Sequence, residues 1–290
     1  MDKKDTDPLK KFADILRDAR IMDDFFMKKV FEDNKPAVQL VLNILLDRED
    51  LIVENFTTSK EYKNIKGHSV CLDVFANDKD GNHYDIEIQR DNKGADPKRG
   101  RYYASMLDTE MLEKRKDFNS LKKAYVIFIM EDDIFKQGEP IYPVERVFTK
   151  TGKPFGDESY ILYVNGTYRG NDKLGRLLHD MFATDPKEMF YPELAGRADY
   201  LKNKQKGKTN MCKALQDLII EEREESLQVG RQEGRQEGRQ EGLQEGLQKG
   251  IKALIEVCQE LGQTDEQIIE KVSRKYHLSK VEAAKYVYAV

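Results

Sequence analysis

CLDVFANDKDGNHYDIEIQR, residues 71–90, alternates apolar and polar side chains on both sides of a glycine-containing turn. Such alternation predicts two half-buried strands joined as a β-hairpin. A two-residue turn at Asp80 and Gly81 would place acidic residues opposite aliphatic ones. We therefore predict a three-residue loop over 79–81, in which Gly81 takes the left-handed conformation of a bulged turn.

This register separates an apolar face of the hairpin from an acidic one. The apolar face holds Leu72, Val74, Ala76, Tyr84, Ile86 and Ile88. Asp73, Asp85, Glu87 and Gln89 occupy positions where a sheet would prefer apolar residues, with Asp73 opposite Glu87 and Cys71 opposite Gln89. Opposed side chains have Cβ atoms about 4.5–5.5 Å apart, so two carboxylates there repel without a counter-ion.

Two interpretations of the acidic face follow. Mg²⁺ is commonly held by one or two carboxylates together with waters and substrate phosphate, so the pair Asp73 and Glu87 fits a divalent metal site. The alternative is a solvated sheet face whose acids point at water.

The segments around the hairpin predict the rest of the core. Aliphatic residues at helical spacing predict a helix over 35–47, and LIVENFT (51–57) predicts a strand. A second helix is predicted over 99–115, and the apolar run KAYVIFIM (123–130) predicts a central strand. The order αβββαβ predicts an α/β fold with a mixed sheet and helices on its faces. The acidic face then lies beside the helix that starts near residue 99.

This order, with an Asp on the second strand and a Glu on the third, resembles the PD-(D/E)XK nuclease superfamily. KGHSVCLDVFANDKDGNHYDIEIQR (66–90), preceded by DDFFMKKVFED (23–33) and followed by KRGRYYASMLDTEML (98–112), is similar to the PD-(D/E)XK nuclease family transposases. That group is related to recombination-promoting nucleases. The resemblance covers residues 20–130, and more loosely extends to about residue 250. It implies a restriction-endonuclease-like core within a nuclease-like domain of residues 1–200.

The resemblance also implies a function and a site. The function is that of a DNA endonuclease, transposase-like or recombination-promoting, dependent on Mg²⁺ or Mn²⁺. Asp73 and Glu87 would bind the metal, with the backbone carbonyl of Ile88 as a further ligand. Gln89 stands where the superfamily usually has a lysine, as is the tendency in this subgroup; its amide can position a water but brings no positive charge. Three acids remain open as the first-helix member of the site: Asp24, Asp47 and Glu49.

The chemical groups of these residues are also those that hydrolysis of a nucleic-acid backbone requires. Two acids and a metal can activate water and neutralise charge that develops at a phosphodiester. Residues 91–123 hold nine Lys and Arg against six Asp and Glu, a net charge of +3, and Lys98, Arg99 and Arg101 cluster where the helix starts. Arginine can bind phosphate oxygens in a fork, so we expect DNA to bind there. The alternatives are a DNA-binding or scaffolding protein on a catalytically weak nuclease fold, and an RNA nuclease.

The second half of the chain predicts additional elements. Residues 141–164 read as a hairpin and 173–182 as an amphipathic helix. Residues 201–250 form a helical or flexible segment that contains the repeat GRQEGRQEGRQEGLQEGLQKG (230–250), with glycine at every fourth position. A helix with six interior glycines loses about 1 kcal/mol at each, so it needs a partner; a homodimer through 220–250 would supply one. The alternative is a flexible spacer.

The last segment, 251–290, reads as a small helical tail. Two capping boxes, Thr264 with Gln267 and Ser279 with Glu282, each predict a helix start.

Composition narrows the class of protein. The chain has 290 residues, 39% of them apolar, which is enough for one or two folded domains. Its net charge of −4 requires any nucleic-acid binding to be local. The first residues lack an apolar signal stretch, so we expect a cytoplasmic protein without a membrane partner. The three cysteines lack the spacing of a zinc site.

Overall fold

The computed structural model describes residues 8–62, 70–90 and 95–289. Contacts divide the chain into two units, residues 1–217 and 218–290. Among the described residues, two hydrophobic clusters lie in the first unit and one in the second.

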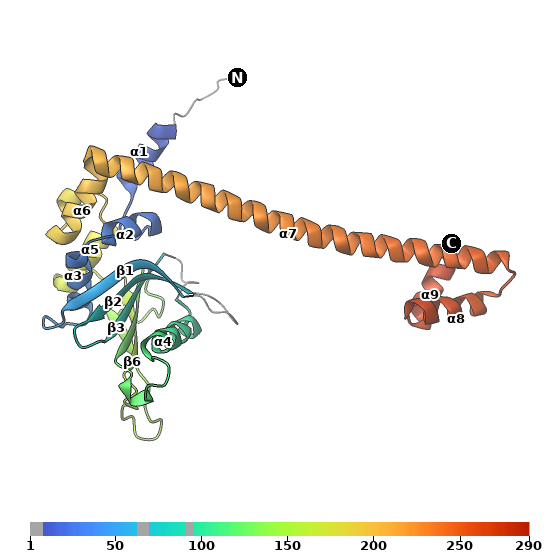
Figure 1. Ribbon diagram of the computed structural model, residues 1–290, viewed down its shortest axis with the longest axis horizontal. Helices are drawn as coiled ribbons and strands as arrows, with labels where there is room; N and C mark the ends of the chain where they lie inside the picture. The colour runs from blue at the N-terminus through green and yellow to red at the C-terminus, as the bar shows by residue number, and fades with distance from the viewer. Residues whose placement is uncertain (1–7, 63–69, 91–94, 290) are drawn as a thin grey trace. The chain divides into compact units, whose positions relative to one another are not determined.

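A mixed sheet forms the centre of the first unit (Figure 1). Its strands in the described residues are β1 Val53–Tyr62, β2 Val70–Asp78, β3 His83–Gln89, β4 Ala124–Met130, β5 Ile141–Val144 and β6 Ser159–Asn165, in the order β1-β2-β3-β4-β6-β5. The first three strands are antiparallel neighbours, whereas β4 runs parallel to both β3 and β6. The predicted α/β class and the αβββαβ order are confirmed.

Helices cover both faces of this sheet. The helices are α1 Pro8–Asp18, α2 Asp24–Phe31, α3 Lys35–Leu45, α4 Pro97–Met111, α5 Lys173–Phe182 and α6 Pro192–Asn203. Residues of α2, α3, α5 and α6 share one hydrophobic cluster with the sheet, and α4 packs against the other face. Asp96 caps α4 by accepting a hydrogen bond from the Lys98 N–H (2.7 Å). This cap fixes the helix start next to the third strand.

Near its turn the β2–β3 hairpin has the predicted register, but the predicted strand pairs Asp73–Glu87 and Cys71–Gln89 do not form, because pairing ends at Val74 and Ile86. Val74 pairs with Ile86 and Ala76 with Tyr84, and Gly81 has φ of +82°. Only a residue without Cβ adopts this φ at little steric cost, so the glycine selects the three-residue loop. The same loop sets which side chains of β3 face α4.

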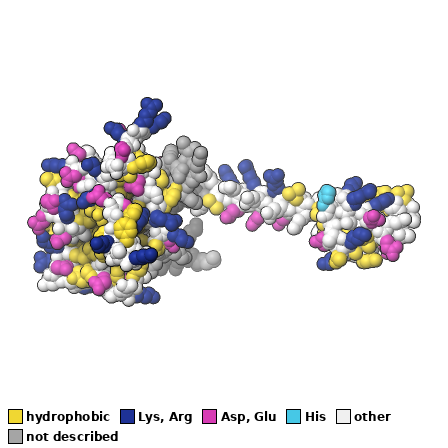
Figure 2. All heavy atoms as spheres, turned by 90° about the horizontal axis from the view of Figure 1, so that it is seen from below, with side chains coloured by type: hydrophobic (Ala, Val, Ile, Leu, Met, Phe, Trp, Pro, Cys, Tyr) yellow, Lys and Arg dark blue, Asp and Glu magenta, His cyan; other side chains and the backbone are white. Residues whose placement is uncertain are grey.

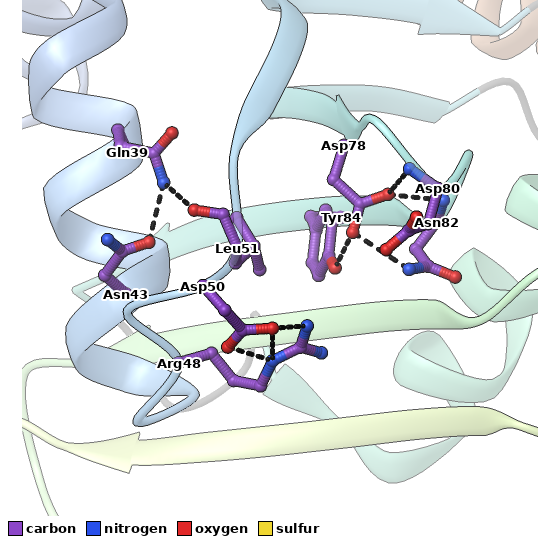
Figure 3. A network of polar contacts seen from close by, with 9 residues as sticks. All are labelled: Gln39, Asn43, Arg48, Asp50, Leu51, Asp78, Asp80, Asn82 and Tyr84. Carbon is purple, nitrogen blue, oxygen red and sulfur yellow. Dashed lines mark hydrogen bonds and ion pairs between the residues drawn. The ribbon is translucent and has the colours of Figure 1, made fainter.

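Asp78 stabilises this turn by accepting four hydrogen bonds (Figure 3). Its Oδ1 accepts from the main-chain N–H groups of Asp80 (3.0 Å) and Asn82 (2.9 Å). Its Oδ2 accepts from the Asn82 side chain (2.9 Å) and from the Tyr84 hydroxyl (2.7 Å). Burial opposes ionisation, but these bonds hold the pKa of Asp78 below its usual value.

Asp78→Asn is expected to lower the free energy of unfolding by about 2–3 kcal/mol, because its amide group would face donors and leave them unpaired. Urea unfolding at pH 7 measures the loss, and Asp80→Asn, an exposed change in the same turn, is the control, expected within about 0.5 kcal/mol of wild type. The pKa of Asp78 is depressed, so its contribution is present above the unfolded value and disappears as the pH falls below about 4. An unfolding free energy of Asp78→Asn equal to that of the wild type at pH 7 would contradict this role.

The predicted apolar face was wrong at Leu72. Leu72 packs in the cluster on the α4 side, whereas Val74 and Ala76 pack in the cluster on the opposite face. Pairing between β1 and β2 passes over Ser59 and Asp73, and Ser59 has φ of +56°. The prediction assumed an unbroken period of two, and this irregularity interrupts it.

The later elements of the first unit agree with the sequence. β5 and β6 pair antiparallel, with Ile141 opposite Val164, which confirms the hairpin over 141–164. The helix α5 coincides with the predicted helix over 173–182.

The second unit contains the glycine repeat and a small helical cluster. The repeat is helical and lies within α7 Gln205–Glu260, followed by α8 Asp265–Tyr276 and α9 Lys280–Val287. Both predicted capping boxes are present. The cluster is formed by Ile251, Ile255, Cys258, Ile268, Val272, Ala283 and Val287. Within the described ranges, no helix is long and apolar enough to cross a membrane.

Candidate active site

The acidic residues meet where β2 and β3 separate. Main-chain pairing of the two strands ends at Val74 and Ile86. Beyond this point carboxylates replace the main-chain acceptors. The Asp73 N–H donates to Glu87 Oε1 (3.0 Å), and the Ile88 N–H donates to Asp73 Oδ2 (3.0 Å). Each carboxylate is therefore held by the backbone of the opposite strand, and the two lie together in the gap, which we call the acidic fork.

The carbonyl of Ile88 points into the same gap. The N–H and C=O of one residue in an extended strand point to the same side. The Ile88 N–H bonds to Asp73 on β2, so the Ile88 carbonyl is also directed toward β2. The next carbonyl, that of Gln89, faces the other way and accepts from the Glu131 N–H (3.0 Å). The fork thus brings together the three groups that the family resemblance implies as metal ligands.

The helix α4 brings a positive charge to the fork. Arg99 Nη2 lies 3.1 Å from Glu87 Oε2, and the Arg99 guanidinium carbon lies 4.8 Å from the centre of the Tyr103 ring. The Gln89 amide also reaches Glu87 Oε2, at a long 3.4 Å. Lys98 and Arg101 are exposed on the first turns of α4. Among the three predicted nucleic-acid contacts, Arg99 touches the acidic pair and the other two lie at the surface beside it.

Asp85 is a buried acid to which the sequence assigned no role. Its side chain is fully buried, and neither carboxylate oxygen has a hydrogen-bond partner in the described part of the chain. Burial raises its pKa well above the usual value, and the charges of Glu87 and Asp73 raise it further. The signal in the sequence was its spacing, since Asp85 shares the strand face of Glu87.

Burial and mutual repulsion also act on the fork itself. Burial raises the pKa of Asp73 to about 6, and the charge of Asp24 adds to it, while the Ile88 N–H, Lys28 and Arg99 oppose the rise. Burial, followed by the charge of Asp73, raises the pKa of Glu87 to about 7. Among the described residues, the acids Asp24, Asp73, Asp85 and Glu87 outnumber the positive charges that act on the fork, Lys28 and Arg99. A divalent cation would relieve this imbalance.

The donor set fits a hard divalent ion. Two carboxylates and one carbonyl provide oxygen ligands, which Mg²⁺ and Mn²⁺ prefer, and Mg²⁺ usually keeps several waters. No group of three His, Cys, Asp or Glu is arranged to hold a metal in the ranges that the structure describes. The ion would therefore complete its shell with water and substrate oxygens.

Of the three acids left open by the sequence, Asp24 is the one whose charge raises the pKa of Asp73. It lies at the start of α2. It also pairs with Lys28 at 3.0 Å. The other two acids left open by the sequence, Asp47 and Glu49, lie after α3, where Glu49 bonds a lysine of α5 at 2.6 Å.

A mixed sheet whose second and third strands separate around two carboxylates, with a basic helix start beside them, is consistent with the PD-(D/E)XK nuclease fold. Residues 21–166, half of the chain, match the family model described as PD-(D/E)XK nuclease family transposase, and the chain belongs to this family. Comparisons with curated proteins and with solved structures give no match. The matched range includes the acidic fork and the whole of α4.

Proposed function

We propose that this protein is a divalent-metal-dependent DNA endonuclease, transposase-like or recombination-promoting, that hydrolyses phosphodiester bonds. The observation that supports this function best is the acidic fork, in which each carboxylate is fixed by the N–H of the opposite strand. Family membership supports nuclease chemistry in general. A solvated polar face, the alternative interpretation of these acids, does not account for Glu87, whose side chain is only 1% exposed.

Each residue at the fork would have a separate role in hydrolysis. Asp73, Glu87 and the Ile88 carbonyl would hold Mg²⁺ or Mn²⁺, which when bound activates water and neutralises charge at the phosphate. Gln89 would orient the attacking water through its amide. Arg99, about one-third exposed, would bind a phosphate oxygen with the donors that Glu87 does not use. Lys98 and Arg101 would contact neighbouring phosphates.

Nicking of supercoiled plasmid DNA tests this proposal. The purified protein should nick or cut DNA with Mg²⁺ or Mn²⁺, should not do so in EDTA, and should lose the activity on Asp73→Ala. Equal cleavage by wild type and this variant would disprove it. Intact DNA binding without turnover in any metal would support the DNA-binding or scaffolding alternative, and cleavage restricted to RNA would support an RNA nuclease.

We also propose a homodimer through residues 220–250. A double-strand break needs two phosphodiesters cut, and one acidic fork acts on one at a time. Within the described residues, nothing lies within 4 Å of the position that a Cβ would take at Gly234, Gly238 or Gly242. Leu227, Val229 and Leu243 are exposed nearby. Repeated Arg and Glu side chains repel along one helix but can pair with an antiparallel neighbour.

The triple variant Gly234→Ala, Gly238→Ala, Gly242→Ala separates a dimer from a spacer. Alanine favours an isolated helix by about 1 kcal/mol at each site but prevents close approach of a second backbone. We expect a dimer in the wild type and a monomer in the variant by light scattering, although helix content is unchanged or higher. Deletion of 230–250 should give the same monomer. A monomeric wild type, or a dimer unaffected by both changes, means that the segment is a spacer.

A further inference from the structure

The connection between β5 and β6, residues 145–158, forms an ordered second hairpin. The Phe148 N–H donates to the Lys153 carbonyl (2.9 Å), and the Phe155 N–H donates to the Arg146 carbonyl (2.8 Å). Val147 and Pro154 form a β-bridge between the two arms. Its side chains are therefore presented by a fixed backbone.

Two aromatic rings are exposed on this hairpin. Phe148 is 53% exposed and Phe155 55%, and their ring centres are 5.6 Å apart in an edge-to-face arrangement. Val147 beside them is 46% exposed. A group of large apolar side chains held at the surface by an ordered turn is typical of a contact site.

The charges at the tip of the hairpin favour a polyanion as its partner. Residues 145–158 contain Arg146, Lys150 and Lys153 and three acids at the base, Glu145, Asp157 and Glu158, so the uncompensated positive charge lies at the tip. Arg146 pairs with Asp157 at the base, while Lys150 and Lys153 are exposed near the tip. Figure 2 views the molecule from the side on which the hairpin projects in Figure 1, and hydrophobic and Lys or Arg side chains lie next to one another on that face.

The helix α4 links this hairpin to the acidic fork. Arg99, near its start, bonds Glu87, and Asp108, nine residues later, is under the electrostatic influence of Arg146 and Asp157 at the hairpin base. Arg99 and Asp108 are therefore about 14 Å apart along α4.

Exposed hydroxyl side chains lie on α4 between these points. Ser105 and Thr109 are exposed, and their hydroxyls bond back to main-chain carbonyls of α4 at 2.8 Å. Glu110 pairs with Lys60 at 3.5 Å.

We propose that the hairpin of residues 145–158 is a second nucleic-acid contact, separate from the phosphate contact at the acidic fork. Lys150 and Lys153 bind backbone phosphates, and Phe148 and Phe155 stack on bases that have left the helical stack. This inference rests on the proposed function, because it names how the same substrate is held.

Binding of a fluorescent 30-base-pair duplex in EDTA tests the inference without cleavage. The duplex carries 2-aminopurine, a base whose fluorescence rises when it unstacks, at successive positions. The variants are the pair Phe148→Ser with Phe155→Ser and the pair Lys150→Gln with Lys153→Gln. The matched control is Phe190→Ser, because Phe190 is 56% exposed and precedes α6, on the opposite side of the sheet from α4.

The two variants should fail in different ways. Loss of both phenylalanines should weaken binding on the order of tenfold and remove the 2-aminopurine signal, since stacking on aromatics contributes at this level. Loss of both lysines should reduce the slope of log K against log salt by about 2. The Phe190→Ser control should bind as wild type does.

Other outcomes overturn the inference. One is that both hairpin variants keep the affinity, the 2-aminopurine signal and the salt slope of the wild type. Another is that the variants change the oligomeric mass instead of DNA binding. A third is that the wild type does not bind the duplex. Hairpin-dependent binding without cleavage in any metal would overturn the proposed endonuclease function and leave the hairpin contact in place. Metal-dependent cleavage that is unaffected by both hairpin variants would support the endonuclease function and overturn the hairpin contact.

Discussion

Replacing Glu87 by glutamine is expected to abolish metal-dependent cleavage and, at the same time, to raise the melting temperature of the metal-free protein. The substituted side chain has the same shape, and its oxygen can still accept from the Asp73 N–H. Its amide nitrogen replaces Oε2 and faces the Arg99 guanidinium, so the ion pair between Glu87 and Arg99 is lost. The raised pKa of Glu87 already includes the favourable charge of Arg99, so removal of the buried carboxylate is still expected to stabilise the metal-free protein. The glutamine lacks the charge that would hold a divalent ion in the acidic fork. A metal contributes several kcal/mol of charge stabilisation, so the expected loss is on the order of 10³-fold or more.

The gain in stability follows from the pKa of Glu87. Burial, together with the charge of Asp73, raises this pKa to about 7 in the folded protein. An acid whose folded pKa is raised stabilises the fold while it is protonated, and that contribution is lost as the pH rises through the folded value. At pH 8 the wild type therefore holds an unfavourable buried charge that Glu87→Gln does not have. At pH 5 the difference should be small.

Thermal unfolding in EDTA at pH 5 and pH 8, alongside plasmid nicking in Mg²⁺ and Mn²⁺, measures both effects. Added metal should raise the melting temperature of the wild type and not that of Glu87→Gln, because only the former binds the ion. Asp80→Asn removes an exposed carboxylate from the turn of the same hairpin and should behave as wild type. Cleavage by Glu87→Gln at the wild-type rate would contradict the assignment of Glu87. A melting temperature of Glu87→Gln below that of the wild type at pH 8 would also contradict it.

Local rules in the sequence predicted the parts of this site that depend on one hairpin. Gly81 allowed one turn geometry, and the separation of acids from aliphatics then selected one register, which placed Asp73 beside Glu87. Periodicity predicted the helix from which Arg99 reaches Glu87. These inferences succeeded because each depends on residues close together in the chain.

Features that depend on distant segments could not be predicted in this way. The position of Leu72 depends on an irregularity at Ser59 in the neighbouring strand, which no alternation in β2 reveals. The burial of Asp85 depends on how α4 covers β3. That the charge of Asp24 acts on Asp73 depends on how α2 packs against the sheet. Each requires the packed arrangement of several elements.

Lys202→Met is expected to destabilise the first unit. Among the substitutions outside the acidic fork, it should lower the free energy of unfolding the most. Lys202 lies on α6 with 6% exposure, and its Nζ donates to three main-chain carbonyls, those of Arg17 (3.0 Å), Ala19 (2.5 Å) and Thr184 (2.6 Å). One ammonium therefore ties α6 to the end of α1 and to the segment after α5. Burial lowers its pKa to about 8, so at pH 7 the charged form with three donors still predominates.

Methionine fills a similar volume but donates nothing, so three largely buried carbonyls lose their shared donor. Each unsatisfied group costs about 1–3 kcal/mol, which gives an expected loss of about 3–5 kcal/mol after partial hydration. For a unit of this size the melting temperature should fall by roughly 10 °C. Lys206→Met, an exposed lysine four residues along the chain, is the control and should change stability by less than about 0.5 kcal/mol. Equal unfolding free energies for the two variants at pH 7 would show that the Lys202 ammonium does not hold these segments together.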